Sequence, residues 1–349
     1  MAPIRSSLVA GVIVLSVLTG CADREAASDT CGEPLSAPAG ELRTVLGGSY
    51  FGEDALILGS AALPDGSVVV AYDANPEEAG GEENWVPEPG LVLLYEDGSC
   101  EPFQVPVVER RRVGLDAQPV AVDDDGRLYL WDHAASRLVR GQVDGAWETV
   151  VTVPSRLLRF TFTPTVTVTR QGEVYIATGP LVSRVTAADE LEAVAGTRVD
   201  PNGAILGDFP RPGTSSPLTD VGGITATPSG GVVMTTRSAV LELSPSGTLD
   251  LVADPETTAG QSGAIVPAYD DKPGSTLTAV AITDSGNVLV SDLPRKRILE
   301  IRAGRSALLV KAESYLSLSR GNAFLAGSAG LLVHQGGGQS LAVLGLAAD

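Results

Sequence analysis

The sequence repeats one short pattern six times: a turn that contains glycine, followed directly by a strand of aliphatic, β-branched and aromatic residues. The copies are PDGSVVVAY at Gly66, DDGRLYLWD at Gly126, RQGEVYIAT at Gly172, PSGGVVMTT at Gly230, DSGNVLVSD at Gly286 and RGNAFLAGS at Gly321. Their glycines lie 60, 46, 58, 56 and 35 residues apart. Repeats of this length are typical of a β-propeller, because each unit is too small to bury a core alone and must pack against its neighbours.

Each unit also shows the spacing of four strands. A strand such as QPVAV precedes the glycine, another begins about eleven residues after it, as at Arg137 and Arg297, and a fourth such as WETVVTV follows. Only the first unit departs from this spacing, because residues 74–90 are inserted before GLVLLY. We therefore predict an all-β fold, a six-bladed β-propeller of four-stranded antiparallel blades, over residues 41–349.

The closure of the ring has two solutions in the sequence. Residues Glu41 to Leu46 look like an additional fourth strand, and so do the C-terminal residues Ser340 to Leu344. Either segment fits the outer strand of the last blade, with the other packed elsewhere. The choice matters because an unpaired first or last blade would expose strand edges.

Two of the units carry the same series of features. DDGRLYLWDHAASRLVR and DSGNVLVSDLPRKRILEI each contain a glycine turn, a hydrophobic strand that ends in Asp, a polar loop, and then Arg with an apolar strand. In this they resemble NHL repeats, and residues 194–236 are similar to the long linker between NHL blades of bacterial surface proteins. The resemblance covers about residues 41–349 and implies a propeller that binds other molecules, although a fold alone does not specify chemistry.

The N-terminus resembles a bacterial lipoprotein signal peptide. Arg5 supplies a positive flank, Leu8 to Leu18 form an apolar run, and the small pair Thr19-Gly20 precedes Cys21. The resemblance implies residues 1–20 as a cleaved signal and a diacylglyceryl group on the Cys21 thiol, so that the mature protein is extracytoplasmic and lipid-anchored to a bacterial membrane. The alternative is a plain signal peptide or a short membrane anchor that happens to contain a cysteine.

Small and polar residues follow Cys21. From Ala22 to Gly40 the chain consists mostly of Ala, Asp, Glu, Ser, Pro and Gly without an apolar period, so residues 21–40 are expected to form a lipidated, flexible tether. With Cys21 assigned to lipid, Cys31 and Cys100 remain as an even pair in an oxidising compartment, which favours a disulfide over two unpaired thiols. Such a bridge would contribute roughly 4 kcal/mol in the chain-entropy model.

The charge of the chain limits its partners. The formal net charge is -19, from 24 basic and 43 acidic residues. Nucleic acid is excluded as a partner, because affinity for it rests on Lys and Arg that neutralise phosphates. The same balance argues against adhesion to anionic lipid through the protein surface, so the membrane contact that we expect is the lipid anchor. Acidity that serves solubility alone is the alternative explanation.

Three long insertions point to one end of the ring. In a four-stranded blade, the connections between blades and the loops between the second and third strands emerge at the same end, and the glycine turns emerge at the other. Residues 74–90, 196–218 and 254–275 all belong to the first group. Long loops are tolerated mainly where they are functional, so we predict that this end is the working face. Neutral surface insertions are the alternative.

The first insertion gathers acidic residues around a tryptophan. It contains Glu82, Glu83, Asn84 and Trp85 within DANPEEAGGEENWVPEPG. Oxygen donors in such a cluster are the ligands that Ca²⁺ prefers, and an exposed Trp is a common contact anchor. No spacing matches an EF-hand loop, however, and a solvated acidic loop explains the composition as well.

Signs of catalysis are few. The chain has two histidines and contains no HExxH, no G-x-S-x-G and no cysteine pair at metal-ligand spacing. His133 follows Asp132 in a loop at the predicted working face, and Asp292 and Arg295 stand at and near the equivalent position of a later unit. We include all four as candidate binding residues, although each Asp also suits a loop cap. We assign no catalytic residue, no metal ligands and no cofactor.

These observations leave three hypotheses. The first is a lipid-anchored propeller without enzymatic activity that binds a protein, peptide or glycan of the cell envelope. The second is a metal-dependent propeller hydrolase or lactonase, and the third is a structural subunit of a larger envelope assembly. Three or more Asp, Glu or Asn side chains that converge near the ring axis would favour the enzyme, whereas Thr, Ser, Ala and Val there would favour the binding protein.

Overall fold

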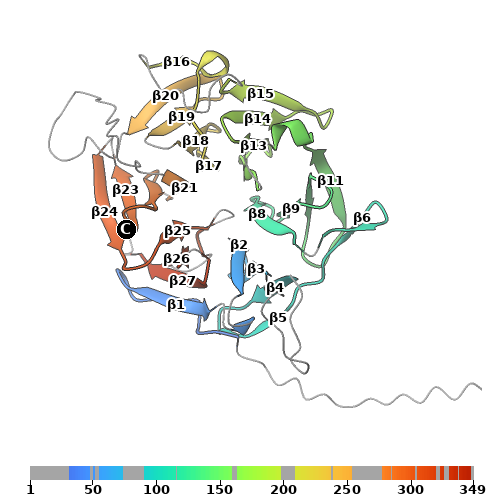
Figure 1. Ribbon diagram of the computed structural model, residues 1–349, viewed down its shortest axis with the longest axis vertical. Coiled ribbons are helices and arrows are strands. Elements are labelled where there is room, and N and C mark those ends of the chain that lie inside the picture. Colours follow the sequence, from blue (N-terminus) through green and yellow to red (C-terminus); the bar gives the residue numbers. More distant parts are fainter. Residues whose placement is uncertain are drawn as a thin grey trace, which may run out of the picture.

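The computed structural model of the protein is a ring of antiparallel sheets (Figure 1). It describes residues 31–47, 50–51, 55–73, 90–114, 116–158, 163–197, 209–236, 239–253, 277–283, 285–302, 305–319, 323–325, 330–336 and 338–346. Six sheets of four or five strands follow one another around the ring, which confirms the predicted six-bladed propeller.

The strands are numbered along the chain, and the strands of each blade are named from the innermost outward. Blade 1 consists of β2 (Leu56–Ala62), β3 (Val68–Asp73), β4 (Gly90–Leu94) and β5 (Cys100–Pro102). Blade 2 consists of β8 (Gln118–Val122), β9 (Leu128–Asp132), β10 (Arg137–Gly141) and β11 (Trp147–Thr152). Blade 3 consists of β12 (Thr165–Val168), β13 (Val174–Thr178), β14 (Leu181–Val185) and β15 (Leu191–Ala195).

The second half of the ring follows the same plan with two additions. Blade 4 consists of β17 (Gly223–Ala226), β18 (Val232–Thr235), β19 (Val240–Leu243) and β20 (Thr248–Ala253), with the short β16 (Arg211–Pro212) added outside β20. Blade 5 consists of β21 (Leu277–Ile282), β22 (Val288–Asp292), β23 (Arg297–Arg302) and β24 (Arg305–Lys311). Blade 6 consists of β25 (Leu316–Leu318), β26 (Gly330–Gln335), β27 (Ser340–Gly345) and the N-terminal β1 (Leu42–Gly47).

The core consists of apolar clusters between neighbouring blades, one at each of the six junctions. Strand β9 illustrates how one strand serves two of them. Leu128 and Leu130 pack toward blade 1, whereas Tyr129 and Trp131 pack toward blade 3. Because side chains alternate between the two faces of a strand and both faces are covered, the second strand of a blade is a continuous apolar run.

Both chain ends close the ring, and their pairing decides between the two solutions that the sequence allows. Strand β1 pairs antiparallel with β27, with Leu42 opposite Leu344 and Gly47 opposite Ser340. The C-terminal strand is therefore the third strand of blade 6, and the N-terminal strand is the fourth. This arrangement leaves no unpaired edge between the first and last blades.

Within its described residues, 323–325, the sixth glycine unit does not form the separate second strand that the pattern predicts. Residues 323–325 pair with the start of β26, because Leu332 N–H donates to the Ala323 carbonyl at 2.7 Å and Leu325 N–H to the Gly330 carbonyl at 3.0 Å. They thus continue the innermost strand beyond β25 instead of forming a separate second strand. Blade 6 is left one strand short, and β1 fills the vacant outer position.

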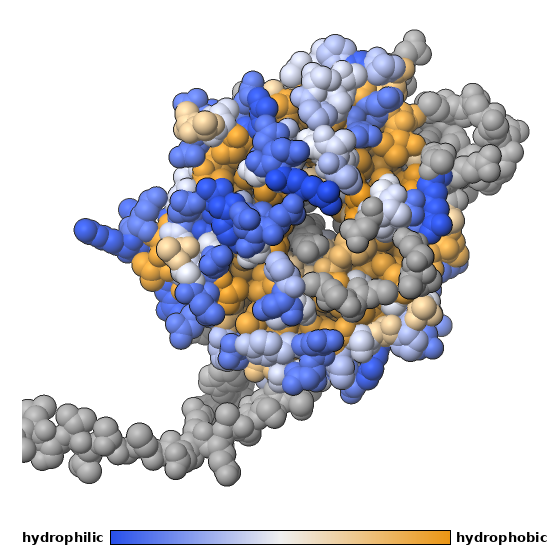
Figure 2. Space-filling view, turned by 180° about the vertical axis from the view of Figure 1, so that it is seen from behind, coloured by the Kyte–Doolittle hydropathy of each residue, from blue (hydrophilic) through white to orange (hydrophobic). Residues whose placement is uncertain are grey.

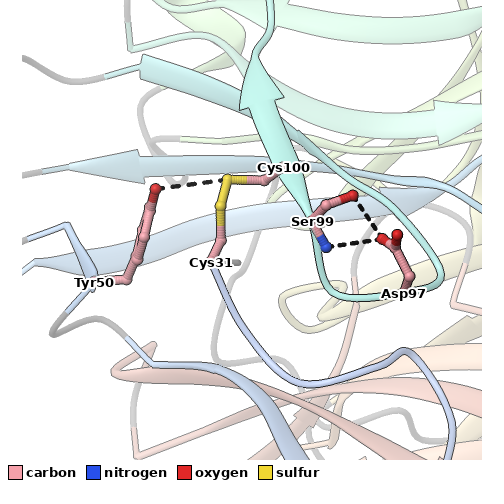
Figure 3. The surroundings of a disulfide bond; sticks show 5 residues. All are labelled: Cys31, Tyr50, Asp97, Ser99 and Cys100. Carbon is pink, nitrogen blue, oxygen red and sulfur yellow. Dashed lines mark hydrogen bonds between the residues drawn. A yellow bond between two sulfur atoms is a disulfide. The ribbon is translucent and has the colours of Figure 1, made fainter. Parts of the chain in front are cut away.

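A disulfide ties the beginning of the described chain to blade 1, as predicted. Cys31 is bonded to Cys100 in β5, with their Cα atoms 5.7 Å apart, and the Tyr50 hydroxyl lies 3.7 Å from Sγ of Cys100 (Figure 3). The Cys31 and Gly32 amides both donate to the carbonyl of Gly98. The part of the predicted tether that follows Cys31 therefore lies against the propeller.

The two ends of the ring differ in their loops. We call the end with the first-to-second and third-to-fourth strand turns the turn face, and the end with the second-to-third strand hairpins and the connections between blades the loop face. On the turn face, Gly66, Gly126, Gly172, Gly230 and Gly286 all have φ between 75° and 88°, a region in which glycine is favoured. Among the described residues, no helix is both long and apolar enough to cross a membrane.

Candidate functional site

Three polar side chains meet on the loop face between blades 2 and 3. His133 begins the hairpin after β9, Gln118 begins the inner strand β8, and Thr163 precedes the inner strand β12. Nε2 of His133 lies 3.4 Å from Oγ1 of Thr163, which donates a hydrogen bond to Oε1 of Gln118 at 3.1 Å. Nε2 of His133 donates to Thr163 in the tautomer that carries its proton on Nε2, while the Thr163 hydroxyl donates to Gln118.

The imidazole of His133 is half-buried, and burial favours its neutral form. Burial lowers the pKa of His133 below its usual value, and the nearby carboxylates of Asp116 and Asp132 oppose the shift only in part. The ring of Trp131 stands edge-to-face with it, with centroids 6.2 Å apart. A neutral imidazole can both donate and accept hydrogen bonds, here beside the ring of Trp131. The group of His133, Thr163 and Gln118 therefore suits the binding of a ligand.

Asp132 directly precedes His133 in the chain, but its side chain is buried. It is 1% exposed, and its Oδ2 accepts from Nε of Arg137 at 2.9 Å. Its Oδ1 accepts from the amides of Gly114 and Ala135 at 3.3 and 3.4 Å. The carboxylate therefore joins the hairpin of blade 2 to the connection that leads into the blade, and no part of it is open to a ligand.

Asp292 and Arg295 occupy the corresponding hairpin of blade 5, three blades further around the ring. Asp292 is fully buried, and its Oδ2 lies 2.8 Å from Arg297 and 3.2 Å from Arg295. The Arg295 side chain is 44% exposed, so it is the only member of this trio with a large surface open to solvent. Asp292 thus orients two arginines, and Arg295 is the one that a ligand on the loop face can reach.

The strands nearest the ring axis carry no charge. Their sequences are LILGSAA, QPVAV, TVTV, GITA, LTAVAI and LSL, in β2, β8, β12, β17, β21 and β25. In the part of the chain that the structure describes, no group of three or more His, Cys, Asp or Glu side chains is placed to hold a metal ion. The polar atoms of the inner strands are instead hydroxyls and one amide.

A second histidine contact, between blades 1 and 6, has no signal in the sequence. Oγ of Ser60 in β2 lies 2.9 Å from Nε2 of His334 in β26 and 3.0 Å from Oγ of Ser319. Ser60 and Ser319 are 0% and 2% exposed, so these groups belong to the packing between the two blades. No local pattern reveals the contact, because the chain must close into a ring before the two segments meet.

The other predicted residues lie outside the described part of the chain. These are Cys21, the predicted lipidation site, and the acidic loop residues Glu82, Glu83, Asn84 and Trp85. Of the candidate binding residues, the structure thus places Asp132 and His133 together in blade 2, and Asp292 and Arg295 together in blade 5.

The ring resembles solved propeller structures at low sequence identity. A candidate gluconolactonase superposes with a TM-score of 0.54 at 14% identity, over 91% of this chain and 97% of that one. Virginiamycin B lyase from Staphylococcus aureus gives 0.51 at 10% identity over 88% and 99% of the two chains, and a gluconolactonase from Xanthomonas campestris gives 0.51 at 12% over 90% and 97%. No protein-family model and no curated protein matches the sequence. At these identities the likeness concerns the fold alone.

Proposed function

We propose that the protein is an exported propeller, anchored to a bacterial membrane by lipid on Cys21, that binds a protein, peptide or glycan of the cell envelope at its loop face. The observation that carries the proposal is the absence of charge on the six inner strands, which consist of Leu, Ile, Val, Ala, Gly, Ser, Thr, Pro and Gln. A propeller hydrolase that uses a central metal ion needs carboxylate or imidazole ligands near the axis.

Two sequence features support the proposed membrane anchor and the proposed binding role. The LTGC segment that ends the apolar run supports lipidation, and the resemblance of blades 2 and 5 to NHL repeats supports a binding role. The polar group of His133, Thr163 and Gln118 supplies hydrogen-bonding side chains at the loop face.

Site-specific crosslinking in intact cells tests the binding face. A photoreactive residue replaces Ala134, exposed in the loop-face hairpin of blade 2, or Asp124, exposed in the turn-face turn of the same blade. We expect a discrete adduct from position 134 and none from position 124. Adducts from position 124 alone would place the partner on the wrong face and contradict the proposal.

Metabolic labelling tests the anchor separately. A fatty-acid label should mark the wild-type protein and leave Cys21→Ser unmarked. Equal labelling of the two proteins would refute lipidation at Cys21 without bearing on the face that binds.

A second candidate is an enzyme that acts on a lactone or a related cyclic ester. Two of the structural neighbours are described as gluconolactonases and another as a lyase, which favours this class over unrelated chemistry. Purified protein that opens a lactone only when a divalent ion is added would support it. No turnover with Ca²⁺, Mg²⁺, Mn²⁺ or Zn²⁺ would leave the binding role as the better explanation.

A further inference from the structure

A short hairpin stands out from the rim of the ring between blades 1 and 2. It is formed by β6 (Val107–Val108) and β7 (Arg111–Arg112), and β6 packs beside β11, the outer strand of blade 2. Figure 1 shows β6 projecting outward, and a hydrophilic projection occupies the corresponding edge when the molecule is seen from behind in Figure 2.

The turn of this hairpin has an unfavourable backbone conformation. Glu109 and Arg110 have φ angles of 51° and 67°, the left-handed region that asparagine and glycine normally occupy in such two-residue turns. Other residues adopt this region only where the surroundings compensate, and such positions cluster at functional sites. Arg110 therefore has a backbone conformation that arginine rarely adopts in a turn.

The hairpin carries three consecutive arginines that form no ion pair with a described carboxylate. Arg110, Arg111 and Arg112 are all exposed, and none of them lies within ion-pair distance of a carboxylate in the described chain. By contrast, Arg140 is paired with Glu148 and Arg184 with Glu173. In a chain with 43 acidic and 24 basic residues, three adjacent cations without an ion pair to any described carboxylate leave this hairpin available to an external anion.

An apolar side chain accompanies these charges. Val107, directly opposite Arg112 in the hairpin, is 63% exposed, the largest exposed fraction among the large hydrophobic residues of the described chain. Cationic side chains next to an exposed aliphatic group match the interface of a bilayer, where headgroups carry charge and the acyl region is close beneath them.

The hairpin follows closely in the chain after the point where the disulfide holds the start of the described chain. Cys31 is bonded to Cys100 in β5, the outer strand of blade 1, and Val107 follows only seven residues after Cys100. Cys31 lies ten positions after Cys21 in the sequence. A chain of that length reaches roughly 35 Å when fully extended, so lipid on Cys21 would hold this part of the rim close to the bilayer.

We propose that the β6–β7 hairpin contacts the anionic headgroups of the membrane that carries the lipid anchor, so that the rim of blades 1 and 2 faces the bilayer. The proposal rests on the anchoring stated under the proposed function. The overall charge of -19 argues against such a contact, but charges farther than a Debye length of about 8 Å are largely screened at physiological salt, so the hairpin acts locally. A ring held on its rim leaves the loop face open to a partner.

Vesicle binding of the unlipidated protein tests the contact. Residues 22–349 contain all six blades and both closing strands, so this portion includes the complete core. It is mixed at 0.1 M salt with vesicles of phosphatidylcholine alone or with one third phosphatidylglycerol. Each arginine near an anionic surface is worth about fivefold in affinity, so Arg110→Gln/Arg111→Gln/Arg112→Gln should bind the anionic vesicles about a hundredfold more weakly.

A matched variant removes three other exposed cations. Arg156→Gln/Arg170→Gln/Lys311→Gln changes the net charge equally, in the connection between blades 2 and 3, on blade 3 and on blade 5, and should keep wild-type binding. Circular dichroism confirms that both variants are folded. Equal binding by wild type and hairpin variant, or no binding of wild type to anionic vesicles, would overturn the proposal.

Two further outcomes separate this proposal from related ones. Retention of the wild type on an immobilised polyanion without vesicle binding would overturn the membrane contact in favour of an anionic polymer. Loss of fatty-acid labelling on Cys21 bears on the anchor alone, because the vesicle assay uses protein without lipid. Vesicle binding that depends on the three arginines would then still support the hairpin contact.

Discussion

Oγ of Ser60 lies 2.9 Å from Nε2 of His334, although 274 residues separate them in the sequence. Ser60 comes from the innermost strand of the first blade and His334 from the second strand of the last. Ser319 completes the group, because its hydroxyl also donates to the carbonyl of Ser60. Side chains therefore join the first blade to the last, in addition to the pairing of β1 with β27 that completes blade 6.

We expect Ser60→Ala to destabilise the closed ring. Alanine differs from serine only in lacking the hydroxyl, so His334 loses its contact with Oγ of Ser60 and Ser319 loses the hydrogen bond that it accepts. A buried polar group that loses its partner costs about 1–3 kcal/mol. Urea unfolding followed by tryptophan fluorescence measures the difference. Ser246→Ala, on an exposed turn of blade 4, is the control and should change the unfolding free energy by less than about 0.5 kcal/mol. Equal stability of the two variants would argue that the contact adds nothing to ring closure.

The fold follows from the sequence where structure is set by neighbouring residues. Glycine turns such as those at Gly126 and Gly286 are local, because a left-handed residue and two adjacent apolar runs suffice to form a hairpin. The prediction for the unit at Gly321 is wrong because pairing partners, and not the local pattern, decide which strand residues 323–325 extend. For the same reason the position of β1 is not predictable, since its partner lies at the other end of the chain.

The candidate site shows the same division. Asp132 and Arg137 lie directly opposite each other in one hairpin. Their pairing can therefore be predicted from the spacing within one repeat. The contact of His133 with Thr163 crosses from blade 2 to blade 3, and its geometry depends on how the blades pack. Sequence patterns therefore identify candidate residues such as Asp132 and His133, but not the side chains from other blades that contact them.

The disulfide is expected to stabilise the propeller by closing a long loop. Cys31 and Cys100 are 69 residues apart in the sequence. Replacing both with alanine should lower the unfolding free energy by about 2–4 kcal/mol. Denaturant unfolding with and without dithiothreitol measures the effect. The reductant should destabilise the wild type and leave the double variant unchanged, whereas a wild type insensitive to a reductant that cleaves the bond would contradict the prediction.

The pH dependence of stability should report the burial of His133. Its pKa in the folded protein is lowered, so the unfolded chain binds a proton more readily. The contribution of His133 is therefore complete above the unfolded value of about 6.5 and declines as the pH falls below it. The difference in unfolding free energy between wild type and His133→Asn should shrink from pH 7.5 to pH 5.5. A difference that grows over this range would mean that the imidazole is stabilised in its charged form.

Proton NMR gives a direct measurement of the same property. With only two histidines in the chain, His334→Gln leaves a single imidazole signal to follow. Its midpoint should lie below 6.5. Asp116→Asn should lower it further, because the Asp116 carboxylate favours the charged ring. A midpoint above 6.5, or one that rises in Asp116→Asn, would contradict the surroundings described for His133.

The two buried aspartates should respond differently to the loss of their arginines. Asp132 has Arg137 as its cation, with side-chain exposures of 2% and 7%, so Arg137→Met leaves an uncompensated buried charge and should cost about 3–5 kcal/mol. Asp292 contacts both Arg297 and Arg295, so Arg297→Met leaves it one cation and should cost clearly less. Methionine keeps the length of the aliphatic stem in both variants, so the comparison isolates the charge.

Urea unfolding of the two variants under the same conditions measures the difference in unfolding free energy. Arg295→Met/Arg297→Met is a third protein, and its loss of stability should approach that of Arg137→Met. If Arg297→Met alone proved as destabilising as Arg137→Met, Arg295 would contribute nothing to Asp292, and its side chain would be held at the loop face by other contacts.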